Sequence, residues 1–456
     1  MSFDVLVRGA TVAGAGAGGQ RRLDIGVADG LIAALAPELA GPATEEIDAA
    51  GLHLMPGVVD AHVHFNEPGR ADWEGFETGT RALAAGGATA AIDMPLNSHP
   101  PTVTAAAFDE KRRCLERSAL VDIALWGGLV PGGVEAMDEL AARGVVGFKA
   151  FMCASGIDDF PGVDDLTLYE GMCRARSLGL PVAVHAESEA ITAGLAQRAR
   201  AEGRTAMRDF LASRPAVAEL QAIARAVALA QESGCSLHVV HVSTGRGVGL
   251  VADARARGVD VTCETCPHYL VLTEEDAEAL GNVAKCAPPL RPRSESEALW
   301  RALSDGTLPI VASDHSPAPW AMKEADDAFA AWGGISGAQT MLALLLTEGY
   351  RARGLELDVI ARVTSSYVAR RFRLAGKGRL EPGADADLVL VDLAGSQALS
   401  AEGLYYRHRH SPFVGRTLRA RVARTLVRGR TVFADGRIVG PPAGRLLIPC
   451  TEMESP

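Results

Sequence analysis

The sequence predicts an α/β protein whose core is a (β/α)8 TIM barrel. Three observations favour this fold class. Eight short runs rich in Val, Ala, Ile and Leu recur along residues 54–317, and helical segments separate them. No Gly-x-Gly-x-x-Gly opens a helix after the first run, which disfavours a dinucleotide-binding sheet. The length of 456 residues fits one large barrel with an appended domain, or two to three domains.

The eight runs have the features of buried strands, because they are short, apolar and flanked by turn-forming Gly and Pro. In chain order they are LMPGVVDAHVH (54–64), GATAAIDMP (87–95), VDIALWGGLV (121–130), GVVGFKAFM (144–152), LPVAVHAE (180–187), SLHVVHVS (236–243), DVTCETCPHYL (260–270) and LPIVASDHSP (308–317). Segments between them, such as GVEAMDELAARG (133–144), have helical spacing and end at Gly. Eight strand-then-helix units fit a barrel better than a doubly wound sheet.

Both ends of the chain differ from this pattern. They contain short alternating strands with Gly turns, as in DVLVRGATV near the start and RVARTLVRGRTVFADGRIV near the end. We expect these strands to pair into one small sheet-based domain that closes the chain. The predicted division is 1–53 for the first part of this domain, 54–378 for the barrel, and 379–456 for the second part with the C-terminal tail.

The composition excludes several classes of partner. Lys and Arg total 45 against 56 Asp and Glu, so the formal charge of −11 makes binding to nucleic acid or to a membrane surface unexpected. No apolar stretch approaches the ~20 residues of a membrane span. The start, MSFDVLVRGA, has the pattern of a strand rather than a signal peptide. Eight scattered cysteines indicate free thiols and a cytoplasmic protein.

Polar residues able to bind metal stand at the ends of five predicted strands. They are His62 and His64 (first strand), Lys149 (fourth), His185 (fifth), His241 (sixth) and Asp314 (eighth). The carboxyl ends of barrel strands meet at one face, so these residues are expected to converge there. Side chains two apart on a strand point to the same side, and the first two histidines can thus bind one ion together. Nitrogen and oxygen donors suit zinc or another first-row divalent metal.

Lys149 is the unusual member of this set. An ammonium group is a poor neighbour for a metal, and burying it unpaired is costly. A lysine with a lowered pKa can react with carbon dioxide and become a carbamate, whose two oxygens can bridge two cations. Alternatively, Lys149 pairs with a carboxylate at the rim of the barrel. The residue pattern alone leaves both alternatives open.

Several motifs together resemble the cyclic-amidohydrolase branch of the amidohydrolase superfamily, which includes dihydroorotase, hydantoinase and allantoinase. The motifs are PGVVDAHVH (56–64), GFKAFM (147–152), VHAE (184–187), HVS (241–243), SDHSP (313–317) and PGADADLVLVD (382–392). The resemblance spans nearly the whole chain. It implies a (β/α)8 barrel, a β-sandwich-like domain built from both chain termini, a homotetramer, and two metals bridged by a carboxylated Lys149.

The resemblance also implies a role for each residue. One metal would be held by His62, His64 and Asp314, and the other by His185 and His241, with carboxylated Lys149 and a hydroxide bridging the two. Zinc is the expected metal, with manganese and cobalt as alternatives. Asp314 would accept the hydroxide proton during attack on a cyclic amide and return it to the leaving nitrogen.

One position bears on the substrate. Dihydroorotase-like sequences typically carry Arg two residues after the second His, whereas this chain has Asn66. Further stretches resemble allantoinases instead: HFNEPGRADWEGF (64–76), DMPLNSHPPT (93–102), ETCPHYL (264–270), CAPPLR (286–291) and WGGISGAQ (332–339). Allantoin is a neutral hydantoin ring with a ureido arm, and a neutral ligand needs hydrogen-bonding groups rather than a carboxylate clamp. The predicted reaction is therefore hydrolysis of allantoin to allantoate, in purine and ureide catabolism.

Candidate substrate contacts lie in loops after the predicted strands. They are Asn66, Asn97, Cys153, Ser155, Cys286, Ser316 and Gly334. For each of them, turn formation or packing is an equally good explanation. Hydantoinase (dihydropyrimidinase) and dihydroorotase activities remain alternatives within the branch. A non-catalytic scaffold of the same fold is the alternative of another class, and the presence of all six metal-ligand candidates favours an enzyme.

Overall fold

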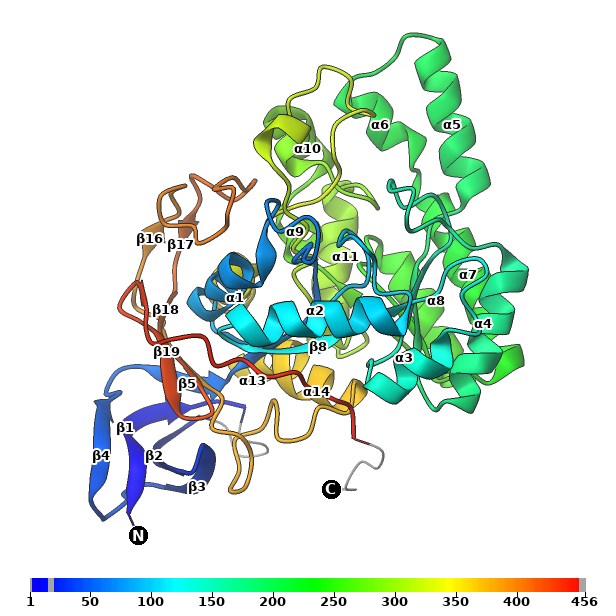
Figure 1. Ribbon diagram of the computed structural model, residues 1–456. Coiled ribbons are helices and arrows are strands. Elements are labelled where there is room, and N and C mark those ends of the chain that lie inside the picture. Colours follow the sequence, from blue (N-terminus) through cyan, green and yellow to red (C-terminus); the bar gives the residue numbers. More distant parts are fainter. Residues whose placement is uncertain (1, 15–19, 451–456) are drawn as a thin grey trace.

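The computed structural model describes residues 2–14 and 20–450 of the chain (Figure 1). The last part of the predicted tail, 451–456, lies outside the described residues. Two bodies are visible: a barrel surrounded by helices, and a separate sheet beside it that both chain ends build. The predicted fold class is confirmed. The limits 1–53, 54–378 and 379–456 stay a prediction.

The terminal sheet contains nine strands among the described residues, in the order β20-β19-β18-β15-β5-β1-β2-β3, with β4 paired to β1. The strands are β1 (Phe3–Val12), β2 (Arg21–Ala28), β3 (Leu31–Ala36), β4 (Ala43–Asp48), β5 (His53–Pro56), β15 (Leu388–Asp392), β18 (Arg421–Val427), β19 (Arg430–Ala434) and β20 (Arg437–Ile438). Antiparallel pairing of β5 with β15 joins the N-terminal strands to the C-terminal ones. A further short hairpin consists of β16 (Gln397–Ala398) and β17 (Thr417–Leu418).

The barrel strands run parallel in two groups, β6-β7-β8 and β9 to β14. They are β6 (Val58–Val63), β7 (Ala88–Asp93), β8 (Asp122–Leu125), β9 (Gly127–Gly128), β10 (Phe148–Phe151), β11 (Val182–His185), β12 (Leu237–Val239), β13 (Val261–Thr265) and β14 (Ile310–Val311). Backbone bonds from Val146 N to Leu125 O (3.0 Å) and from His64 N to His315 O (2.8 Å) join the groups and close the barrel.

The first predicted strand, 54–64, is in fact two strands. The chain leaves the terminal sheet at the end of β5 and enters the barrel with β6, and Gly57 lies between them. A Cβ atom at Gly57 would lie only 2.2 Å from the side-chain oxygen of Thr89, so this close approach requires glycine. The short β8 and β9 likewise share the third predicted run.

Helices follow the barrel strands and cover the barrel from outside (Figure 1). They are α1 (Gly75–Ala85), α2 (Ala105–Ser118), α3 (Met137–Arg143), α4 (Asp165–Ser177), α5 (Glu189–Ala201), α6 (Met207–Ser213), α7 (Ala216–Ser233), α8 (Gly245–Ala256), α9 (Pro267–Val271), α10 (Glu274–Leu280), α11 (Arg293–Ser304), α12 (Met341–Leu344), α13 (Leu357–Ala361) and α14 (Tyr367–Arg371). Short 3-10 or π turns are η1 (Gly281–Ala284), η2 (Trp320–Met322), η3 (Ala338–Thr340), η4 (Leu345–Arg351) and η5 (Arg362–Ser366). No helix in residues 2–14 and 20–450 is both long and apolar enough to cross a membrane.

Local sequence explains where several of these helices begin and end. Thr104 and Thr244 precede α2 and α8, and each side chain accepts a bond from a backbone N–H of the first turn. Gly144 and Gly234 follow α3 and α7 with positive φ angles of 92° and 67°. The threonine caps therefore begin α2 and α8 after the loops at the carboxyl ends of β7 and β12, and the glycines end α3 and α7 before the next strand.

Candidate metal centre

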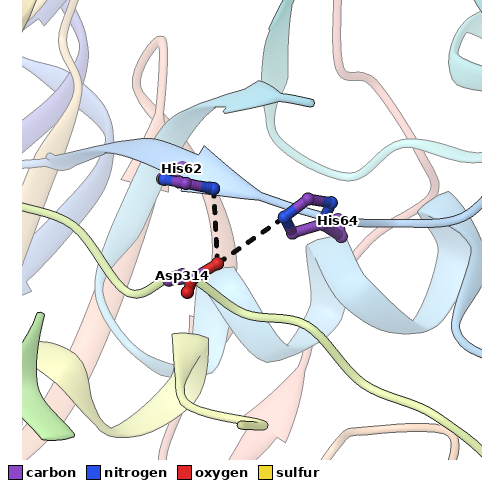
Figure 2. Close-up of side chains that lie close together, drawn as sticks. All are labelled: His62, His64 and Asp314. Carbon is purple, nitrogen blue, oxygen red and sulfur yellow. Dashed lines mark ion pairs between the residues drawn. The ribbon is translucent and has the colours of Figure 1, made fainter. Parts of the chain in front are cut away.

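Two histidines and an aspartate converge at the carboxyl ends of β6 and β14 (Figure 2). His62 lies on β6, His64 directly follows that strand, and Asp314 follows β14. One carboxylate oxygen of Asp314, Oδ1, lies 3.3 Å from Nε2 of His62 and 3.5 Å from Nε2 of His64. All three residues are buried. Two nitrogens and an oxygen pointing at one place are a donor set for a divalent transition metal.

A second pair of histidines lies beside this cluster. Nδ1 of His185, at the end of β11, is 3.1 Å from Nε2 of His241, which follows β12. The ring of His241 is centred 5.4 Å from that of His62. Burial lowers the pKa of both His185 and His241, so both imidazoles are neutral and can offer a lone pair. A cation between the two facing nitrogens would satisfy both.

Lys149, on β10, is fully buried, and its Nζ has no hydrogen-bond partner. No ion pair involves this lysine within the described part of the chain, so pairing with a rim carboxylate is not observed. Burial lowers its pKa to about 7, which favours the neutral, nucleophilic amine. A buried amine without a partner is costly, and an additional group at this position would relieve the cost. The residues present therefore fit the carbamate and metal set expected from the sequence.

A buried carboxylate that the sequence analysis did not identify supports the cluster. Glu264, on β13, binds Nδ1 of His62 at 2.6 Å and Nε2 of His238 at 3.1 Å. Burial alone would raise the pKa of Glu264, but the two histidines lower it to about 2. This carboxylate keeps the proton of His62 on Nδ1 and turns Nε2 toward Asp314. No clear signal for Glu264 was present in the sequence, because the run 260–270 also contains Asp260, Thr262 and His268.

The backbone is strained at two of the candidate ligands. His241 and Asp314 have positive φ angles of 40° and 45°, in the left-handed region that such residues rarely adopt. Each such residue costs on the order of 1–3 kcal/mol and persists only where the surroundings enforce it. In both cases the turn follows a strand of only two or three residues, β12 or β14. The strain therefore coincides with the two positions that turn a side chain into the centre.

A cavity of about 720 Å³ opens over these residues. Five predicted substrate contacts line it: Asn97, Ser155, Cys286, Ser316 and Gly334. Asn66 and Cys153 are buried outside the lining. The side-chain nitrogen of Asn66 donates to the carbonyl of Pro317 (3.3 Å), and its backbone has a φ of 64°. Asparagine tolerates that conformation, which gives Asn66 a structural reason independent of any substrate.

Two further groups of potential ligands overlap with the centre. Cys266 and His268 lie near Asp314, and Cys153 and Glu187 lie near His185. Each group shares one residue with the sets above, so these residues extend the same centre rather than forming separate sites. Burial raises the pKa of Cys266 well above its usual range, which keeps its thiol protonated.

Comparison with known proteins decides the family. Residues 53–432 match the sequence profile described as the amidohydrolase family. The chain belongs to the amidohydrolase family. Family membership and the His/Asp donor set together indicate an enzyme that binds divalent metal. The resemblance to cyclic amidohydrolases drawn from the motifs is thereby confirmed.

Individual relatives narrow the comparison within the amidohydrolases. The chain is 61% identical to an allantoinase from Rubrobacter xylanophilus over 99% of both chains. It is 54% identical to an allantoinase from Solibacter usitatus over 98% of this chain and 97% of the relative. Among solved structures, it is similar to an L-hydantoinase (dihydropyrimidinase) from Arthrobacter aurescens, with a TM-score of 0.95, 36% identity and coverage of 98% and 100%.

Proposed function

We propose that this amidohydrolase opens the cyclic amide ring of allantoin to give allantoate, a step of purine and ureide catabolism. The observation that carries the proposal is the 61% identity to an allantoinase over 99% of both chains. The cavity supports it, because neutral hydrogen-bonding residues such as Asn97, Ser155 and Ser316 line the space above the centre. A neutral ring with a ureido arm needs such groups rather than a carboxylate clamp. The cations that also line the cavity are already engaged: Arg200 with Asp327, Arg214 with Glu187, and Lys285 with backbone carbonyls.

The proposed cofactor is a pair of divalent ions, zinc in the first place, with manganese or cobalt as alternatives. His62, His64 and Asp314 would hold one ion, and His185 and His241 the other. Lys149 would bridge them after its Nζ attacks carbon dioxide, loses a proton and becomes a carbamate anion. When bound, such ions lower the pKa of water and polarise a carbonyl group.

Asp314 is the proposed general base and acid. Its carboxylate accepts a proton from the attacking water while the oxygen of that water bonds to the carbonyl carbon of the ring. The same residue then gives the proton to the ring nitrogen as the carbon–nitrogen bond breaks, so the ring opens to a neutral nitrogen and a carboxylic acid. The acid then releases its remaining proton to solvent and becomes the carboxylate. The proposed substrate contacts Asn97, Cys286 and Ser316 line the cavity. Contacts from Asn66 and Cys153 would require a local rearrangement, because neither lines it.

Hydantoinase activity is the second candidate, and the likeness to the Arthrobacter aurescens L-hydantoinase favours it. The lower identity of 36%, against 61% and 54% to the allantoinases, places it second. Dihydroorotase activity ranks below both, because Asn66 stands where an arginine would grip the substrate carboxylate. A non-catalytic scaffold ranks last, since all six candidate ligands are present.

Assembly and compartment belong to the same proposal. We infer a homotetramer from the resemblance to cyclic amidohydrolases. A cytoplasmic location is supported by the free thiols of all eight cysteines, six of which are buried.

A substrate panel tests the proposed function. The purified chain is supplied with zinc, manganese or cobalt and bicarbonate, and its turnover of allantoin, hydantoin, dihydrouracil and dihydroorotate is compared. We expect the highest kcat/KM for allantoin. Faster turnover of hydantoin or dihydroorotate contradicts the substrate assignment. Absence of both metal binding and turnover favours the scaffold.

A further inference from the structure

A buried polar chain begins at His185 and leads away from the candidate centre. Glu187 is completely buried, and its Oε2 accepts a hydrogen bond from Nε2 of His185 at 2.8 Å. The same oxygen pairs with the guanidinium of Arg214. His185 thus has one ring nitrogen toward His241 and the other fixed by a carboxylate whose charge is balanced by an arginine.

Arg214 belongs to the wall of the substrate cavity. It directly follows α6, which with α5 projects beyond the barrel at the upper right of Figure 1. Its side chain is 20% exposed and lines the cavity together with Phe210 and Ser213. The guanidinium lies 5.7 Å from the centre of the Phe210 ring. One side of this arginine therefore faces the cavity, and the other faces Glu187.

The position of Arg214 is fixed by Arg291, which lies in the loop before α11. The main-chain carbonyl of Arg214 accepts a hydrogen bond from the guanidinium of Arg291, which also donates to Oγ of Ser243 at 3.0 Å. Ser243 donates through its N–H and Oγ to buried Glu219, at 2.7 and 2.9 Å. Ser243 lies two residues after His241, so the network reaches the loop that carries the second histidine of the pair.

We propose that Arg214 is a positioning residue for the second of the two metals in the proposed function. An ionised Glu187 binds the N–H of His185 at Nε2 and thereby leaves the lone pair on Nδ1, the nitrogen that faces His241. Without the guanidinium of Arg214, Glu187 is a buried anion that has lost its directly paired cation, and it gains by turning toward water in the cavity. That movement frees the imidazole of His185 to rotate or to exchange its tautomer. The first cluster of His62, His64 and Asp314 does not depend on this network.

Zinc binding by the full-length chain tests this role separately from catalysis. The metal-free protein is equilibrated with buffered zinc at graded free concentrations, and bound metal per chain is measured. In Arg214→Met, we expect the dissociation constant of one of the two zinc ions to rise by about 10–100-fold while the other zinc is bound as in the wild type. Arg214→Lys keeps a cation but loses the planar guanidinium. Its dissociation constant for this zinc should lie between those of the wild type and Arg214→Met. Cobalt absorption spectra should show the loss of one of two bound ions.

A matched control lies on α6, the helix that directly precedes Arg214. Arg208, on α6, pairs with Glu278 at the surface and has a 78% exposed side chain. Arg208→Met should bind both ions as the wild type does. If Arg214→Met does not fold, Glu187→Gln takes its place, because glutamine has the same shape but cannot form the ion pair. The same selective loss of one of the two ions is expected.

The outcomes separate this role from the proposed reaction. Unchanged zinc affinity in the folded Arg214 or Glu187 variant, or equal weakening of both ions, overturns the role of Arg214. If wild-type protein binds two ions but does not turn over allantoin, the substrate assignment is wrong. The result on the positioning role of Arg214 is then unaffected. A wild-type chain that holds a single ion overturns the role of Arg214 and the two-metal cofactor, whereas the substrate assignment is still decided by turnover of allantoin.

Discussion

At the residue scale, burial of Asp314 disfavours its ionised carboxylate, whereas the neighbouring histidines stabilise it. Burial alone would raise the pKa of its carboxyl, but His62, His64 and His241 lower it well below its usual range. Its backbone is held in the left-handed region by the turn that follows β14. Asp314 therefore stays ionised and fixed in direction, as a group must be if it is to accept a proton from water at neutral pH.

We expect Asp314→Asn to lower kcat for allantoin by roughly 10²–10⁴-fold, because asparagine keeps the shape but cannot accept the proton. Steady-state kinetics with zinc in excess, together with bound metal per chain, separates this effect from loss of a ligand. Asp305→Asn, in the exposed turn after α11, serves as a control and should keep wild-type kinetics. A variant with full metal content and a kcat within about threefold of the wild type contradicts the role of Asp314 in proton transfer.

The sequence predicted where the candidate metal-binding residues converge, but not which of the candidate substrate contacts line the cavity. A His-x-His pair at a strand end and isolated polar residues after other strands are local patterns, and the barrel brings strand ends together by a general rule. Asn66 shows the limit. The sequence shows asparagine where dihydroorotase-like sequences carry arginine. The φ of 64° and the hydrogen bond to Pro317, however, depend on the folded loop. Glu264 was missed because a binding partner on a distant strand has no local signature.

At the element scale, two buried lysines hold the segment 329–334 of the cavity rim through hydrogen bonds to its backbone carbonyls. Lys323 donates to the carbonyls of Trp332 (2.9 Å) and Gly334 (2.6 Å), and Lys285 donates to those of Phe329 and Ala331. Neither lysine forms an ion pair within residues 20–450. The sequence predicted this segment only as a loop, because hydrogen bonds from lysine to backbone carbonyls follow no sequence pattern.

Lys323 should make stability depend on pH in the alkaline range. Burial, with help from nearby Lys285, lowers its pKa to about 7, whereas an unfolded lysine titrates near 10.4. Between these values the unfolded chain binds more protons than the folded one, so the free energy of unfolding rises with pH, by up to about 1.4 kcal/mol for each pH unit. Urea unfolding from pH 7 to 9.5 should show a smaller rise in Lys323→Met. Parallel curves for the variant and the wild type would contradict this.

At the scale of the whole molecule, the barrel and the terminal sheet are joined by a buried ion cluster. Nζ of Lys377 binds carboxylates of Asp122 (2.6 Å), Asp385 (2.9 Å) and Asp387 (2.8 Å), and Arg428 also pairs with Asp122. Asp122 begins β8 in the barrel, whereas Asp387 immediately precedes β15 in the sheet. The cluster therefore lies at the amino ends of the barrel strands, opposite the candidate centre. Strand patterns at both chain ends predicted the sheet, but not this junction.

Lys377→Met should separate stability from chemistry. Removing one cation leaves three carboxylates with only Arg428 to balance them, and breaking a buried pair in this way costs roughly 3–5 kcal/mol of unfolding free energy. Arg112→Met, which breaks an exposed pair with Glu116 on α2, should cost at most about 1 kcal/mol. Both variants should keep the wild-type kcat at temperatures where they are folded, because neither residue lies near the cavity. Urea denaturation and initial rates measure the two quantities. A fall in kcat for folded Lys377→Met would mean that the junction also shapes the opposite face of the barrel.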